Sequence, residues 1–119
     1  MKNIKELSTN NINKQGIFNA CPVTFTIDKI GGRWKPLILY NLRQGKKRYS
    51  ELKRVIPAIS EKMLIQQLKE LEQDQLVLRE SLPVVPPHVK YSLTKPGKGM
   101  EPILNAMAAW GLKNNKRPK

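Results

Sequence analysis

The sequence is poor in cysteine, histidine and acidic residues. Its 119 residues include one Cys and one His, and 9 Asp plus Glu stand against 22 Lys plus Arg. A single cysteine cannot form an internal disulfide, which fits a reducing compartment. One cysteine and one histidine far apart in the chain make no plausible zinc site. Since no glycine-rich phosphate loop, catalytic carboxylate pair or Ser/His/Asp set stands out either, we expect no enzymatic activity and no cofactor.

Long hydrophobic runs are also missing. The longest apolar stretches are PLILYNL and ILNAMAAWGL, whereas a helix that crosses a bilayer needs roughly 18–20 such residues. Residues 1–20 lack the continuous apolar block of a secretory signal. We therefore expect a cytoplasmic protein with no membrane partner.

The charge balance points to a polyanionic partner. Hydrophobic residues make up 39% of the chain, as in an ordinary globular domain, but the net charge is +13. Such a surplus suggests nucleic acid or an anionic membrane surface. The membrane ranks last, because the apolar helix faces predicted below are needed for the core. Residues 21–60 carry a net +7, residues 61–82 a net −2 and residues 83–119 a net +6. The densest basic run is GKKRYSELKR at 45–54, although such a run can also be only a solvated face.

The first half of the chain shows signals for short helices. Pro22 suits a first helical position and the pair Gly31 and Gly32 suits a helix end, which favours a helix over a strand here. A second helix is expected in RWKPLILYNL, ending before Gly45. Its apolar face is predicted to consist of Trp34, Leu37, Ile38 and Leu42.

A helix-turn-helix is predicted next. Ser50 is expected to cap a helix that carries Leu52, Val55 and Ile56 and that Pro57 ends. Ser60 is expected to cap the following helix, whose buried stripe at i, i+4 and i+7 consists of Leu64, Leu68 and Leu71. Two short helices joined by a tight connection are typical of this motif.

In the last third of the chain, the spacing of apolar residues changes from a helical period to about two. The arms VLRESLP and HVKYSLT alternate as strands around a proline-rich tip, which predicts a hairpin. A final helix is expected to start near Pro102, with a stripe of Ile103, Met107 and Trp110, before a basic tail. We therefore predict a mainly α fold with a small β-hairpin, which is the element order of a winged helix-turn-helix.

Four sequence segments, in this order, resemble the HxlR-type family of bacterial and archaeal transcription regulators: IGGRWKPLIL, RYSELKRVIPAISEKML, LKELEQDQLV and VPPHVKYSLT. The resemblance covers roughly residues 21–112. It implies a winged helix related to MarR-like regulators and a homodimer formed through terminal helices, with Ile103, Met107 and Trp110 in the dimer surface. It divides the chain into an arm (1–20), the regulator domain (21–112) and a basic tail (113–119). One departure is KPGKGM at 95–100, where two glycines and a proline should weaken the start of the last helix.

Duplex DNA is the expected partner, and the helix from Ser60 is the expected recognition helix. Such helices contact bases chiefly with N-terminal residues, so the base-reading candidates are Ser60, Lys62, Met63, Gln66 and Gln67. Flanking segments should meet phosphates, and these candidates are Lys46, Lys47, Arg48, Tyr49, Lys53, Arg54 and Lys90. The wing tip is expected to consist of Pro86, Pro87 and His88.

Three alternatives stay open at this point. Gln66 and Gln67 could simply be helix formers on a solvated surface, the preferred interpretation for the helix taken alone, although its basic surroundings favour base reading. Tyr49 could equally pack against the core instead of lying near a phosphate. The whole domain could also serve as a protein-interaction or RNA-binding module, because fold alone does not settle function.

Cys21 directly precedes Pro22, so its thiol is expected at the N-cap of the first helix. The helix dipole favours the thiolate there and raises its reactivity. Members of the resembled family sense quinones, aldehydes or hypochlorite with a cysteine at the start of this motif, which makes Cys21 a candidate sensor. A small, partly buried packing residue is the alternative.

Overall fold

The computed structural model describes residues 21–86 and 88–116. The chain divides into two units, residues 1–32 and 33–119. The predictions for residues 1–20, for Pro87 and for 117–119 lie outside the described residues, and the predicted division into arm, domain and tail stays a prediction. In the first unit, helix α2 (Pro22–Ile30) has Cys21 as its N-cap and Gly31 as its C-cap, as predicted.

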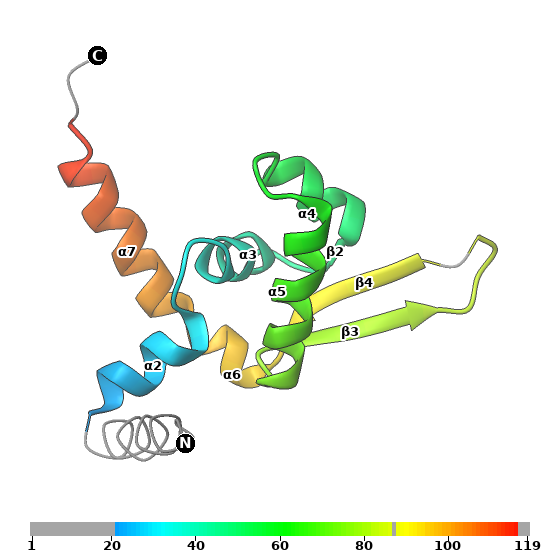
Figure 1. The fold of residues 1–119 in the computed structure, drawn as a ribbon, viewed down its shortest axis with the longest axis horizontal. Helices are drawn as coiled ribbons and strands as arrows, with labels where there is room; N and C mark the ends of the chain where they lie inside the picture. The colour runs from blue at the N-terminus through cyan, green and yellow to red at the C-terminus, as the bar shows by residue number, and fades with distance from the viewer. Residues whose placement is uncertain (1–20, 87, 117–119) are drawn as a thin grey trace, which may run out of the picture. The chain divides into compact units, whose positions relative to one another are not determined.

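The second unit is a winged helix-turn-helix, which confirms the predicted fold class. Figure 1 shows α4 and α5 close together, the hairpin beside α5, and α7 on the side of the unit opposite the hairpin tip. No helix in the described part of the chain is long and apolar enough to cross a membrane. The elements in chain order are α3 (Lys35–Leu42), β2 (Lys47–Arg48), α4 (Tyr49–Val55), α5 (Glu61–Gln73), β3 (Val77–Leu82), β4 (His88–Leu93), α6 (Lys95–Lys98) and α7 (Glu101–Asn114).

The wing is part of a three-stranded antiparallel sheet in the order β2-β4-β3. The predicted hairpin of β3 and β4 is confirmed, with Val77 opposite Leu93 and Leu82 opposite His88. The sequence reading missed β2, which pairs Lys47 with Tyr91 and Arg48 with Lys90. A strand of two residues has no alternation to detect, since it exists only through its pairing with a distant segment.

The core lies where α3, α4 and α5 pack together, and its largest fully buried side chains are all aliphatic. The predicted stripe of α5 is confirmed, because Leu64, Leu68 and Leu71 are fully buried. The predicted face of α3 is wrong at Leu37, which is 40% exposed, and Leu39 is buried instead. Leu37 turns toward α7, where it lines a shallow apolar depression, so it does not share the face that packs on α5.

The helix-turn-helix begins earlier than predicted. Helix α4 starts at Tyr49 with Arg48 as its N-cap, so the expected cap at Ser50 is wrong. Its first turn is held by the Glu51 carboxylate, which accepts a hydrogen bond of 2.7 Å from the Arg48 backbone N–H. The helix ends before Pro57 as expected, but Val55 is exposed and only Leu52 is buried within it. The predicted cap at Ser60 is confirmed, because its hydroxyl accepts a hydrogen bond of 3.1 Å from the Met63 N–H.

The segment between the wing and the last helix forms a short helix of its own. The Thr94 hydroxyl caps α6 by accepting a hydrogen bond of 3.1 Å from the Gly97 N–H, and it donates one of 2.6 Å to the Gln75 carbonyl. Helix α7 then begins at Glu101, with Pro102 in its first turn as expected. The expected weakening at 95–100 therefore takes the form of a break between two helices.

Candidate nucleic-acid interface

Helix α5 presents a polar ridge to solvent opposite its buried leucines. With 3.6 residues per turn, Lys62, Gln66 and Lys69 follow one another on the outward side, and all three are exposed. The side chain of Ile65, 47% exposed, lies next to this ridge on the flank toward the sheet. The predicted base-reading residues Ser60, Lys62, Met63 and Gln66 are thus on the accessible surface of one helix.

The side chain of Gln66 is held by a series of polar contacts. Its amide Nε2 donates to Glu70 at 3.1 Å, and the other carboxylate oxygen of Glu70 lies 2.6 Å from the Lys35 ammonium. Lys35 and Gln66 both lower the pKa of the Glu70 carboxyl, so Glu70 is charged at neutral pH. Lys35 belongs to α3, and its side chain is only 11% exposed. The amide of Gln66 keeps its second N–H and its oxygen for other partners.

Gln67 is placed differently from Gln66. It is half-buried, and its amide lies 3.5 Å from the Met63 sulfur within the same helix. Gln66 is therefore the better presented of the two predicted amides. The assignment of both to base reading stays a prediction.

The sheet brings basic residues from two distant segments together beside α5. Arg48 of β2 lies directly opposite Lys90 of β4, and side chains of directly opposed residues share one face of a sheet. Burial lowers the pKa of the His88 imidazole, and the positive charges of Arg48 and Lys90 lower it further. The pair therefore forms a local centre of positive potential at the wing, which the sequence predicted only as two separate basic runs.

The other phosphate candidates differ in how accessible they are. Lys46 forms an ion pair of 3.1 Å with Glu80, and Lys53 donates a hydrogen bond of 3.3 Å to the Pro57 carbonyl. Lys47 is half-buried, whereas Arg54 is exposed at the end of α4. Arg48 and Arg54 are thus the phosphate candidates that the structure supports best, and Lys90, opposite Arg48, is half-buried like Lys47.

Tyr49 braces the helix-turn-helix. It is half-buried, and its hydroxyl donates a long hydrogen bond of 3.5 Å to the Glu61 carbonyl at the start of α5. Burial raises the pKa of the Tyr49 phenol, with smaller contributions from Glu61 and Tyr91. It also borders a concavity of about 590 Å³ between α5 and the sheet. Of the two roles left open for Tyr49, its contacts favour positioning α5.

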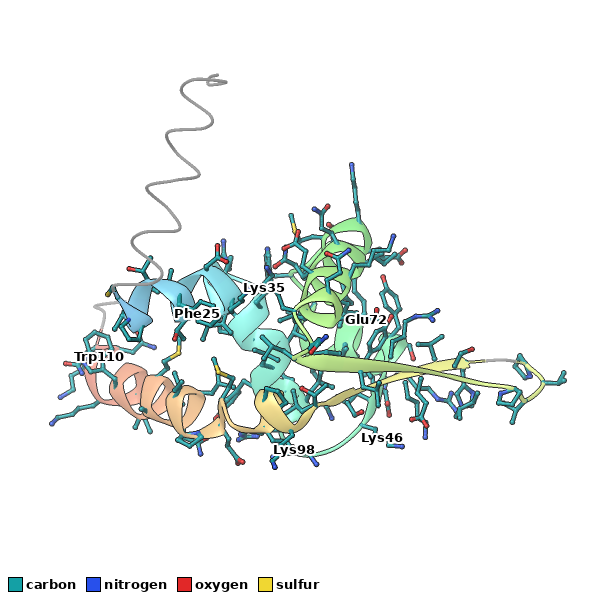
Figure 2. The ribbon with its side chains drawn as sticks, turned by 90° about the horizontal axis from the view of Figure 1, so that it is seen from below. Phe25, Lys35, Lys46, Glu72, Lys98 and Trp110 are labelled. Atoms are coloured by element: carbon teal, nitrogen blue, oxygen red, sulfur yellow. The ribbon has the colours of Figure 1, made fainter. Side chains whose placement is uncertain are left out.

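Helix α7 carries an apolar stripe that the described residues of its own unit leave largely exposed. Ile103, Met107 and Trp110 are 41%, 50% and 70% exposed, whereas Leu104 is buried. Figure 2 shows Trp110 on α7, well away from Lys46 and the wing. The three residues follow at i, i+4 and i+7, so they lie on one side of the helix.

Cys21 lies at the N-cap of α2 and is half-buried. It makes no capping hydrogen bond with its side chain. Even so, the nearby Thr24 hydroxyl, together with the backbone amides of Thr24 and Val23, lowers the pKa of its thiol, and partial burial opposes this effect. The predicted N-cap position is confirmed, and its surroundings favour the thiolate.

The fold and these surfaces match a known family. The sequence profile of the HxlR-like helix-turn-helix family matches residues 29–119. The chain belongs to the HxlR-like helix-turn-helix family. This confirms the resemblance drawn from the four segments of the sequence. The HxlR-like chain is 49% identical over 102 residues to the HTH-type transcriptional regulator YybR of Bacillus subtilis, covering 86% of this chain and 78% of YybR.

Solved structures agree with this assignment. The redox regulator HypR in its oxidized form superposes with a TM-score of 0.79 at 48% identity, covering 82% of this chain and all of HypR. The reduced form of the transcriptional regulator YodB from B. subtilis gives 0.70 at 38% identity, covering 83% of this chain and 98% of YodB. The HxlR-like protein is therefore a helix-turn-helix transcriptional regulator.

Proposed function

We propose that this HxlR-like protein is a homodimer that binds duplex DNA of a preferred sequence by placing α5 in the major groove. The observation that carries the proposal is the capped N-terminal half of α5, with Lys62 and Gln66 outward, beside the paired Arg48 and Lys90 of the sheet. A helix with its side chains is about 10–12 Å across, and the major groove is about 12 Å wide. Arg48 and Lys90 would then meet the phosphates along the groove wall.

The near neutrality of the region around α5 agrees with a helix that reads bases while flanking residues bind phosphates. Residues 61–82 carry a net charge of −2, whereas the whole chain carries +13. A net negative charge would be unfavourable for a phosphate-binding element. Glu70 pairs with Lys35, and this pairing offsets one of the acids. Gln66 can make a bidentate pair with adenine, worth about 1–3 kcal/mol in discrimination.

Selection of bound duplexes from a random pool tests this proposal. Gln66→Ala is expected to change the preferred sequence, because it removes a contact to a base edge. Arg48→Gln is expected to weaken all duplexes alike and to reduce the slope of log affinity against log salt by about one, because it removes a phosphate contact.

Lys98→Gln is the matched control for Arg48→Gln. It removes the same charge from α6, on the side of the unit away from α5 (Figure 2), and it should change neither affinity nor slope. Selection of no duplex over random sequence, or equal binding of structured RNA, would contradict the proposal in favour of an RNA-binding or protein-binding module.

We further propose that Cys21 makes DNA binding responsive to oxidants. Its lowered thiol pKa supports this, as does the similarity to HypR, whose structure is described as that of a redox regulator. Cys21 is the single cysteine of the chain, so a disulfide requires a second molecule. Two Cys21 thiols, one from each copy, would form an S–S bond and give two protons and two electrons to diamide, which is reduced to the hydrazine. A small thiol could take the place of the second Cys21 and form a mixed disulfide.

Diamide is expected to change the affinity of the wild type for the selected duplex and to leave Cys21→Ser unaffected. Alkylation of Cys21 should reach half its maximal rate below the pH of about 8.5 that an ordinary thiol requires, because a lower pKa gives more thiolate at a given pH. Thr24→Val should raise this midpoint, since it removes the hydroxyl that lowers the pKa most. If Cys21→Ser responds to diamide as the wild type does, Cys21 is not the sensor.

A further inference from the structure

An aliphatic side chain stands among the polar residues of the α5 surface. Ile65 is 47% exposed, although it directly follows the fully buried Leu64. It lies three residues from Lys62 and four from Lys69, so these three side chains are neighbours on the helix. An exposed isoleucine between two lysines is therefore available for contact on the proposed DNA-facing surface.

The neighbouring parts of the unit cover Ile65 only in part. A concavity of about 590 Å³ lies between α5 and the sheet and is lined by Ile65, Val89 and Tyr91. A second depression, of about 410 Å³, lies on the other flank of Ile65 and is lined by Lys62, Gln66 and Gln73. Ile65 borders both open spaces, and 47% of its surface is left exposed between them.

The surroundings of Ile65 favour a duplex over a protein partner. Lys62 and Lys69 flank it, and Arg48 lies opposite Lys90 on the neighbouring sheet. Glu61 and Glu72 also line the concavity beside Ile65. An apolar side chain between two lysines is nonetheless complementary to a groove bordered by phosphates. Within the major groove the apolar group that base edges offer is the C5-methyl of thymine, which aliphatic side chains contact.

We propose that Ile65 is a specificity-determining residue that contacts a thymine methyl group in the major groove. The proposal rests on the function proposed above. Because Ile65 adjoins Gln66 on the helix, the thymine belongs to the base pair that Gln66 reads or to one next to it. Burying one methyl-sized group is worth about 0.8 kcal/mol, so one contact changes affinity about fourfold.

Replacement of thymine by deoxyuridine removes only this methyl group and so tests the contact directly. Each thymine of the selected duplex is replaced in turn, and dissociation constants are measured by fluorescence anisotropy for the wild type and for Ile65→Ala. Replacement of one particular thymine in each half-site is expected to weaken binding of the wild type about fourfold. The same replacement should cost Ile65→Ala nothing, because the variant has already lost the contact.

Leu78→Ala is the matched control, because Leu78 is an aliphatic residue of similar exposure on β3. It should retain the full deoxyuridine penalty of the wild type. Ile65→Ser carries no methyl group and serves as a second variant if Ile65→Ala does not fold.

Equal deoxyuridine penalties in the wild type and both Ile65 variants would overturn the proposal, and so would the absence of any penalty in the wild type. Both outcomes leave the selected sequence intact and are distinct from failure of the proposed function. If the proposed function is wrong, no duplex is selected at all, and the proposed role of Ile65 is then wrong as well.

Discussion

A Trp110→Glu variant is expected to be a monomer in solution and to bind the selected duplex about 10²–10⁴-fold more weakly than the wild type. Trp110 is 70% exposed and continues the stripe of Ile103 and Met107 along α7. Large aromatic residues are the usual anchors of an interface, and a carboxylate buried among apolar side chains without a partner is costly. If two α5 helices are held together by α7, binding of the first raises the effective concentration of the second at its half-site. The monomer loses this gain.

The spacing of the half-sites follows from the same dimer. Two recognition helices related by a two-fold axis reach successive major grooves, about 34 Å apart, so the selected duplex should contain a palindrome with half-sites one helical turn apart. Sedimentation velocity gives the oligomeric state of Trp110→Glu, and anisotropy titration gives its affinity. Circular dichroism should show an unchanged fold, since Trp110 is largely exposed within its own unit.

Asn105→Glu is the matched control for the dimer. Asn105 is exposed on the same helix but lies two residues from both Ile103 and Met107, which places it on the opposite side. This variant gains the same charge and should remain a dimer with wild-type affinity. If Trp110→Glu also remains a dimer, α7 is not the interface. If it is a monomer with unchanged affinity, one α5 suffices for binding and the paired half-sites are wrong.

The sequence predicted best the features that local chemistry decides. The cap at Ser60 and the spacing of Leu64, Leu68 and Leu71 need only the hydrogen-bonding and period of one helix, and both are confirmed. The hairpin strands were recognisable for the same reason, because alternation within each arm sets which side chains face the core.

What the sequence did not predict depends on contacts between distant segments. Strand β2 exists because Lys47 and Arg48 pair with β4, more than 40 residues later. This pairing leads the chain into α4 two residues earlier than predicted, which makes Arg48 the cap instead of Ser50. On α3, the choice between Leu37 and Leu39 as the buried residue is set by where α5 and α7 lie, and a short apolar run does not disclose it.

The sequence predicted the helix of the candidate site, but not the contacts that shape its exposed surface. The helix α5 and most of its exposed residues followed from the pattern, although Gln67 is half-buried. The contacts from Lys35 through Glu70 to Gln66 join two helices and could not be predicted from spacing. Ile65 was overlooked because apolar residues are first assigned to the core. Its position directly after Leu64, outside the i, i+4 and i+7 stripe, was the available signal that it is exposed.

Gly97→Ala is expected to lower the free energy of unfolding by an amount at the upper end of about 1–3 kcal/mol. A Cβ atom at Gly97 would overlap the carbonyl oxygen of Leu76 and touch the side chain of Leu93. The Leu76 carbonyl cannot move away without cost, because it accepts a hydrogen bond of 3.1 Å from the Thr94 N–H. The same Thr94 caps α6 through the Gly97 N–H. The glycine is therefore required by close packing of α6 on the chain just before β3, and its substitution would strain both contacts together.

Gly99→Ala separates this packing effect from a general effect of alanine in the same turn. Its Cβ would lie 3.2 Å from the Pro96 carbonyl oxygen, a contact that small shifts relieve, so the expected change is within about 0.5 kcal/mol. Urea unfolding of both variants at one protein concentration measures the difference, since the stability of a dimer depends on concentration. If both variants unfold at the wild-type midpoint, α6 does not approach Leu76 this closely. The glycines of KPGKGM would then serve only to break the helix, as the sequence alone suggested.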